Sequence, residues 1–263
     1  MDLNEAEMKS ISRELIEAEQ NATPITNLTD RFPDVTLREA YAIQMKSLEA
    51  KLKTGQVVVG HKIGLCAKAN QQKYCANGPI YGHIFSDMVV AEGEPISMSR
   101  LIRPIIEGEV CFVLKEELRG PGIDMAKVLA ATVGVLPAFE IADDRYKEQK
   151  RKVVDPVSDN AGAAMVILGG KLTPITDIDL RLVGMVLEKD GEIVATGAGA
   201  AVLGNPAQAV ASLANNLAEH NMSLRAGEFI ISGSLTISIP IQGGSCYRAT
   251  FDRLGSVSAR FVR

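Results

Sequence analysis

The stretch Arg103-Pro-Ile-Ile-Glu107-Gly-Glu109-Val-Cys-Phe-Val-Leu114 sets two carboxylates inside an otherwise apolar run. The apolar residues of this run, several of them β-branched or aromatic, predict a strand over residues 105–114. Side chains two positions apart on a strand project from the same face, so Glu107 and Glu109 would lie side by side. Burying two like charges this close together is costly unless a positive charge joins them.

A second apolar run, Val133-Gly-Val-Leu-Pro-Ala-Phe-Glu-Ile-Ala142, carries Glu140 in a similar setting. Three carboxylates on two strands would form a cage for a hard divalent cation such as Mg²⁺ or Mn²⁺, which prefers oxygen ligands. The alternative is that Glu107 and Glu109 lie on the wet face of an amphipathic strand, because charged residues are mostly exposed. The residues alone leave both interpretations open.

The composition narrows the class of protein. The chain has 263 residues, 46% of them hydrophobic, which is enough for a substantial core. Its formal net charge is −4 and it has no long basic run, so we expect neither nucleic acid nor a membrane as a partner. Four widely spaced cysteines fit a reduced protein better than a zinc site or a disulfide framework. Without a signal pattern or a spanning apolar run, we expect a cytoplasmic protein.

The order of elements predicts an α+β fold. Helical periodicity predicts a helix over residues 3–20, and Thr36 with Glu39 predicts a capping box that opens a second helix. Strand patterns predominate after these helices. We therefore expect an N-terminal helical segment over residues 1–55 and a β-rich catalytic core over residues 56–263.

Several local patterns add detail. Asp190-Gly191 between two apolar runs predicts a β-hairpin, and Asn205-Pro206 predicts the start of a helix. The charged segment 143–152 is interpreted as a solvent-exposed loop or helix face, with a mobile lid over an acidic substrate as the alternative. The glycine-rich stretch 197–204 has neither the spacing nor the setting of a dinucleotide loop. The three histidines lack metal-ligand spacing and are interpreted as structural or surface residues.

An ordered set of motifs carries a resemblance to a known family. The motifs are Gly60-His-Lys-Ile-Gly-Leu65, Glu107-Gly-Glu109, Pro137-Ala-Phe-Glu140, Ser158-Asp-Asn-Ala161, Gly197-Ala-Gly-Ala-Ala-Val-Leu-Gly204 and Gly255-Ser-Val-Ser-Ala-Arg-Phe261. They resemble the hydratase/decarboxylase branch of the fumarylacetoacetate hydrolase superfamily. This branch includes the 2-keto-4-pentenoate hydratases and 4-oxalocrotonate decarboxylases of aromatic meta-cleavage pathways. No single motif is specific, but the ordered set is.

The resemblance implies a mixed β-roll or barrel core with flanking helices. It also implies a lyase that uses Mg²⁺ or Mn²⁺ and adds water to a 2-hydroxy-2,4-dienoate to give a 4-hydroxy-2-oxo acid. The site residues it implies are the metal ligands Glu107, Glu109 and Glu140, the catalytic Lys62, and the substrate-binding Tyr81, Ser232 and Ser234. Without the family, Lys62 would be interpreted as a gatekeeper at a strand edge and the two serines as an ordinary strand end.

Two positions depart from the family pattern. Ile80 stands where hydratases commonly carry Asp, and Gly162 stands where many relatives carry Ser. Decarboxylation of 4-oxalocrotonate is therefore the alternative activity, because it needs no base for an attacking water. A non-catalytic protein that binds a metal and an oxo acid is the alternative from another class. The resemblance further implies a homo-oligomer, with a partner enzyme of the same pathway as an additional expectation.

Overall fold

The computed structural model describes residues 3–148 and 151–263 of the chain. Its α-helices are α1 (Glu5–Gln20), α2 (Leu28–Arg31), α3 (Leu37–Lys53), α4 (Lys68–Lys73), α5 (Met125–Ala131), α6 (Val154–Ser158) and α7 (Pro206–Ala218). Short 3₁₀ helices are η1 (Ser86–Met88), η2 (Met98–Arg100), η3 (Asn160–Gly162) and η4 (Gly199–Ala201). The strands are β1 (Val58–Gly64), β2 (Ile80–Phe85), β3 (Val89–Val90), β4 (Pro95–Ser97), β5 (Ile105–Leu114), β6 (Thr132–Ala142), β7 (Ala163–Leu168), β8 (Gly184–Lys189), β9 (Glu192–Ala198), β10 (Phe229–Ser234), β11 (Ile239–Pro240), β12 (Cys246–Phe251) and β13 (Gly255–Val262).

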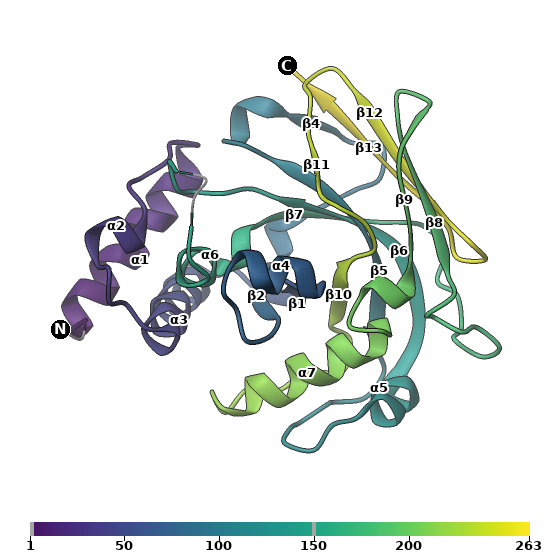
Figure 1. Cartoon of the computed structure of the whole chain (residues 1–263), viewed down its shortest axis with the longest axis horizontal. Coiled ribbons are helices and arrows are strands. Elements are labelled where there is room, and N and C mark those ends of the chain that lie inside the picture. The colour runs from purple at the N-terminus through teal and green to yellow at the C-terminus, as the bar shows by residue number, and fades with distance from the viewer. Residues whose placement is uncertain (1–2, 149–150) are drawn as a thin grey trace.

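Two mixed sheets form the centre of the molecule (Figure 1). The larger sheet has the order β2-β1-β10-β5-β6-β7-β3, and β11 also pairs with β5. The smaller sheet has the order β4-β13-β12-β8-β9. Strand β5 lies in the interior of the larger sheet and is antiparallel to both β10 and β6. Glu109 is fully buried and Glu107 is half-buried, so the wet-face interpretation is wrong for Glu109.

The N-terminal helices pack beside the sheets and follow their capping signals. The Thr36 side chain accepts a hydrogen bond from the Glu39 backbone N–H, and the Glu39 side chain accepts one from the Thr36 backbone N–H. The predicted capping box is therefore confirmed. Helix α1 begins with a similar box between Asn4 and Glu7. Ile11 and Leu15 of α1 lie in an apolar cluster with Ile43 of α3. This contact explains why the two helices run together along one side of the sheet.

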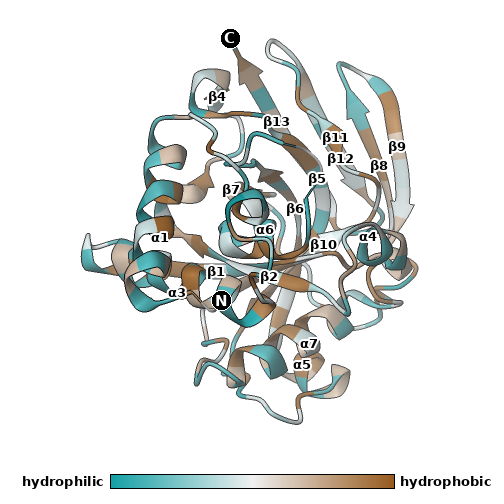
Figure 2. Ribbon diagram, turned by 60° about the vertical axis from the view of Figure 1, so that its left-hand side comes forward, coloured by the Kyte–Doolittle hydropathy of each residue, from teal (hydrophilic) through white to brown (hydrophobic). Residues whose placement is uncertain are grey.

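The main core lies between the two sheets and α7. It contains Phe112 of β5, Phe139 of β6, Leu187 of β8 and Leu213 of α7, all buried. Figure 2 shows apolar residues along much of the central strands. The Asp190-Gly191 hairpin is confirmed between β8 and β9, and Asn205 caps α7 as predicted. Among the described residues, no helix combines the length and the apolar character needed to cross a membrane.

One expectation about the surface is wrong. The charged segment 143–152 was expected in solvent, yet Asp143, Arg145 and Tyr146 are buried. The carboxylate of Asp143 accepts backbone hydrogen bonds from Ile102 and Arg103 at 2.7 Å each, so it fastens the chain just before β5. The buried carboxylate of Asp143 is thus satisfied by partners about 40 residues away, which a local pattern does not show, whereas Lys147, Glu148 and Lys152 of the same segment are exposed as expected. Residues 149 and 150 of this segment lie outside the described part of the chain.

Candidate active site

Strand pairing brings the three predicted carboxylates together. Glu107 is paired directly with Glu140 across β5 and β6, and Glu109 follows two residues later on the same face. One carboxylate oxygen of each residue lies within 4.8 Å of those of the other two. Gly108 faces the opposite side, where an added Cβ would lie 2.3 Å from the Met185 sulfur. The Glu-Gly-Glu motif therefore has one face for the carboxylates and one face too crowded for a side chain.

Lys62 joins the carboxylates from β1. Strand β1 runs to Gly64, so Lys62 lies within the strand. Lys62 is paired with Ile231 of β10, which is paired in turn with Cys111 of β5, so it shares the face of Glu109. Its Nζ lies 2.7 Å from Glu140 Oε1 and donates a hydrogen bond of 2.9 Å to the Ala161 carbonyl oxygen.

Negative charge exceeds positive charge in this buried group. Glu109 and Glu140 are fully buried. Among the described residues, Lys62 is the only cation in contact with any of the three carboxylates, through Glu140. Burial raises the pKa of Glu140 to about 7, even with Lys62 beside it. Burial and the neighbouring Glu140 also raise the pKa of Glu109 well above its usual value. Burial alone would lower the pKa of Lys62, but the carboxylates of Glu140 and Glu107 outweigh it and raise that pKa.

The donor set fits a divalent cation. With all four groups ionised, three carboxylates and one ammonium leave two negative charges uncompensated, which matches the charge of Mg²⁺ or Mn²⁺. The ligand atoms are carboxylate oxygens, the type that these ions prefer. Glu109 Oε1 is buried and has no hydrogen-bond partner among the described residues. A bound cation would satisfy this oxygen and remove the repulsion among the carboxylates.

The end of β10 supplies donors next to the carboxylates. The Gly233 backbone N–H donates a hydrogen bond of 2.7 Å to Glu109 Oε2, at a point where the register of β10 and β5 shifts. Ser234 is paired with Glu109, and the buried Ser232 hydroxyl has no partner among the described residues. The hydroxyl of Ser238 donates to Glu107. The sequence did not predict Ser238 or the contact of the Gly233 N–H with Glu109, because only the fold shows that this turn reaches β5.

Tyr81 does not join the group. Lys62 is paired with Gly82, whereas Tyr81 is paired with Ile63, so the tyrosine projects from the opposite face of the sheet. Its ring stacks on Tyr41 of α3 with 4.7 Å between centroids. The geometry therefore separates this predicted substrate-binding residue from the carboxylates.

Several known proteins are similar to this chain along most of its length. No family model matches it. A 4-oxalocrotonate decarboxylase from Pseudomonas sp. (strain CF600) is 40% identical over 260 residues, which cover 99% of this chain and 98% of that relative. A 2-oxo-hept-4-ene-1,7-dioate hydratase from Escherichia coli is 38% identical over 258 residues, covering 96% and 97%. The solved structure of 4-oxalocrotonate decarboxylase from Pseudomonas putida G7, complexed with magnesium and adipate, matches with a TM-score of 0.96 at 38% identity and covers 99% of both chains.

The chain belongs to the hydratase/decarboxylase branch of the fumarylacetoacetate hydrolase superfamily. The resemblance and the fold type expected from the motifs are thereby confirmed. Members of this family are lyases, and hydratases and decarboxylases match this chain almost equally well.

This family member has an apolar wall beside its lysine. Ile80 is buried against Val157 and Ala161. A Cβ on Gly64 would lie 3.3 Å from the Ile80 side chain and 3.6 Å from Lys62 Nζ, so both side chains border Gly64. Position 80 therefore contributes no proton-transfer group to the site.

The buried histidines lie outside the site. His61 and His83 contact each other through their Nδ1 atoms at 3.2 Å, on the face of β1 and β2 opposite Lys62. His61 also lies 3.4 Å from the carboxylate of Glu228. Burial lowers the pKa of His83 well below its usual value, so this ring is neutral.

Proposed function

We propose that the protein is a metal-dependent lyase that acts on short unsaturated 2-oxo acids and their dienol forms in aromatic catabolism. Its first candidate reaction is the addition of water to a 2-hydroxy-2,4-dienoate, which gives a 4-hydroxy-2-oxo acid. The observation that carries the proposal is the group of half-buried Glu107 and buried Glu109, Glu140 and Lys62, which leaves two negative charges uncompensated when all four are ionised. A related solved structure contains magnesium and a dicarboxylate, which supports the same ligand chemistry.

In this proposal Glu107, Glu109 and Glu140 hold Mg²⁺ or Mn²⁺. When bound, the ion supplies a Lewis acid that stabilises negative charge on the 2-oxo oxygen of the substrate. Ser232 and Ser234 bind the substrate carboxylate, a role that the unpartnered Ser232 hydroxyl suits. The Gly233 N–H keeps Glu109 in place through its hydrogen bond.

Lys62 is the proposed catalytic residue. The Ala161 carbonyl and Glu140 fix its Nζ at two points, so the position of its proton is defined. It would transfer a proton to or from the carbon chain as the dienol and oxo forms interconvert.

Decarboxylation of 4-oxalocrotonate is the second candidate, and Ile80 is the observation that favours it. The apolar wall around Ile80 offers no base that would activate a water. Loss of CO₂ needs only the electron sink and a proton donor, both of which the first proposal already includes. The two candidates therefore share a site and differ in whether a water must be activated.

The proposal also includes a cytoplasmic homo-oligomer. The edge strand β9 exposes Ile193 and Val194, which suits contact with a second copy. Light scattering on the purified protein tests this part, and a monomer at all concentrations would contradict it.

A Mg²⁺-dependent ultraviolet assay with product analysis tests the function. The substrates are 2-hydroxypenta-2,4-dienoate and 4-oxalocrotonate, measured side by side. Conversion of the dienoate to a 4-hydroxy-2-oxo acid supports hydration. Release of CO₂ from 4-oxalocrotonate alone assigns the second candidate and makes Ile80 the deciding residue. Tight metal-dependent binding of both compounds with no turnover would contradict the lyase proposal and favour a non-catalytic binder.

A further inference from the structure

The carbonyl that holds Lys62 belongs to an unusual turn. Residues Asn160, Ala161 and Gly162 have φ angles of 50°, 53° and 71°, so three consecutive residues adopt the left-handed conformation. Only glycine adopts it readily, and the other two residues persist there when their surroundings hold them. The turn Asp159–Gly162 therefore depends on contacts outside itself.

On the side of the active site, the turn contacts β1 and β2. Ala161 O accepts the hydrogen bond from Lys62 Nζ. The Asn160 side chain accepts a hydrogen bond from the His83 backbone N–H at 2.8 Å and donates one to the His83 carbonyl at 2.9 Å. A Cβ on Gly82 would lie 2.3 Å from Asn160 O, so only glycine permits this approach. Movement of the turn would therefore move the acceptor of Lys62.

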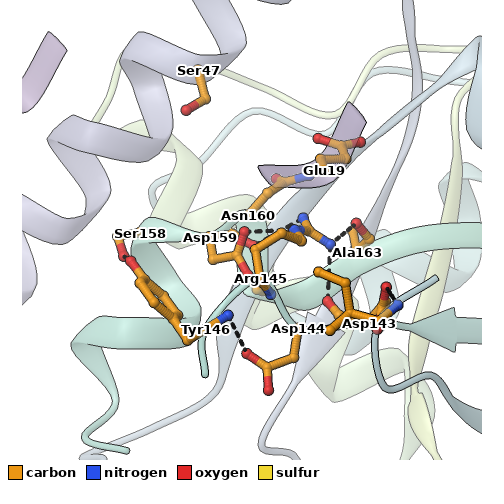
Figure 3. Close-up of polar contacts among 12 residues, drawn as sticks. Glu19, Ser47, Asp143, Asp144, Arg145, Tyr146, Ser158, Asp159, Asn160 and Ala163 are labelled. Atoms are coloured by element: carbon orange, nitrogen blue, oxygen red, sulfur yellow. Dashed lines mark hydrogen bonds and ion pairs between the residues drawn. The ribbon is translucent and has the colours of Figure 1, made fainter. Parts of the chain in front are cut away.

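On the other side, a buried ion pair holds the turn (Figure 3). Arg145 Nε donates to Asp159 Oδ1 at 2.7 Å, and the Arg145 backbone N–H donates to Asp159 Oδ2 at 3.0 Å. Arg145 Nη1 also donates to the carbonyls of Asp143 and Ala163 at 2.9 and 3.0 Å, and Ala163 directly follows the turn. A bidentate, charge-assisted contact of this kind fixes direction as well as distance.

Two hollows lie beside this ion pair. A cavity of about 460 Å³ between the N-terminal helices and the sheet is lined by Arg145, Asp143, Glu19 and Lys51 among others. A second hollow of about 20 Å³ borders Asp159 and Asn160 directly. The larger cavity therefore borders the arginine side of the ion pair, and the turn itself borders only the small hollow.

We propose that Arg145 and Asp159 are positioning residues for the reaction: they hold the left-handed turn so that Ala161 O directs Lys62 Nζ towards Glu140 and the substrate. The inference rests on the proposed role of Lys62. Neither residue touches the carboxylates or the substrate in this account. Their effect passes through the turn.

The test compares Arg145→Lys and Asp159→Asn with wild type and with Arg103→Lys. Arg103 is the matched control, because it bonds to Asp144 and to main-chain carbonyls of the same segment but not to the turn. In both test variants we expect kcat to fall about tenfold or more, because a small displacement of a catalytic group slows turnover strongly. KM and the Mn²⁺ affinity measured by electron paramagnetic resonance should stay within about twofold. If Arg145→Lys does not fold, the isosteric Asp159→Asn carries the test.

A second readout does not depend on turnover. The reactivity of Lys62 towards an amine-modifying reagent, followed by peptide mass spectrometry, should rise in both variants and stay unchanged in Arg103→Lys. Unchanged kcat and unchanged Lys62 reactivity in both variants would overturn the inference. A fall in kcat that merely parallels a loss of Mn²⁺ affinity would also overturn it. An inactive wild type would reject the proposed function, while the labelling would still decide whether the pair positions Lys62.

Discussion

Two buried clusters of charge lie on either side of the Asp159–Gly162 turn, and they differ in balance. In the first, the Arg145 guanidinium bonds to Asp159, and the nearby Asp143 carboxylate is occupied by two backbone N–H groups. In the second, the single ammonium of Lys62 faces the carboxylates of Glu107, Glu109 and Glu140. Every carboxylate oxygen of Asp159 and Asp143 accepts a hydrogen bond, whereas the second cluster leaves buried oxygens without partners among the described residues.

This difference separates a structural role from a chemical one. Isolated buried charges are unfavourable, so a balanced pair with saturated hydrogen bonds serves to hold main chain in place. A cluster with excess negative charge takes up a proton or binds a cation from outside the chain. The turn between the clusters links them, since Asp159 belongs to the first and the carbonyl of Ala161 serves the second.

The largest expected loss of activity comes from removing one carboxylate charge from the cluster of Glu107, Glu109, Glu140 and Lys62. Glu140→Gln keeps the volume but weakens the metal site, and we expect kcat/KM to fall roughly a thousandfold, since a bound metal contributes several kcal/mol to such a transition state. The substrate assay measures this loss. Glu116→Gln, an exposed carboxylate just beyond β5, is the control and should keep its activity. Equal activity of the two variants would remove Glu140 from the site.

The pH dependence of the free energy of unfolding should differ between the metal-free and the metal-bound protein. Burial holds the pKa of Glu140 near 7, above its ordinary 4.5, so the folded protein retains a proton that the unfolded chain releases. Stability of the metal-free protein should therefore decrease as the pH rises through this window, by roughly 3 kcal/mol at most. Urea unfolding in a chelator at about pH 5 and about pH 8 measures this trend. Excess Mg²⁺ should reverse it, because the ion binds the ionised carboxylates; the same slope with and without Mg²⁺ would contradict the account.

Replacing Lys62 should lower kcat more than it weakens metal binding. Lys62→Met keeps the apolar stem, and we expect kcat to fall about a hundredfold, in the range of lost general acid–base catalysis. Mn²⁺ should remain bound, because its proposed ligands are all present. Rapid kinetics and a metal titration on the same preparation measure the two effects. Turnover close to that of wild type would show that another group moves the proton.

The smallest effect is expected where charge is balanced but exposed. Arg181 and Asp179 form an ion pair on the surface, with 2.6 Å between Arg181 Nη2 and Asp179 Oδ2. Neither residue belongs to either buried cluster. Solvent screens such pairs, so Arg181→Ala should leave the melting temperature and kcat unchanged within error. A clear loss of stability would mean that pairing itself, rather than burial and balance, governs these effects.

Local patterns predicted the elements well and the contacts between them less well. The capping box at Thr36 and the Asp190-Gly191 turn are encoded within a few residues, so both were predicted correctly. Strand alternation predicted that Glu107 and Glu109 share a face. The acceptor of Lys62 is 99 residues away in sequence, and only the fold reveals it. The burial of Arg145 was missed for the same reason, because its partner Asp159 lies beyond the segment whose composition looked exposed.

A titration of the protein with Mn²⁺ tests the central claim most directly. Electron paramagnetic resonance would follow free and bound ion for wild type and for Glu107→Gln, Glu109→Gln and Glu140→Gln. Wild type should bind a single ion per chain saturably, and the affinity should be at least about tenfold weaker in each variant. Wild-type protein that binds no Mn²⁺ saturably, or three variants that bind it as tightly as wild type, would contradict a metal site at the three carboxylates.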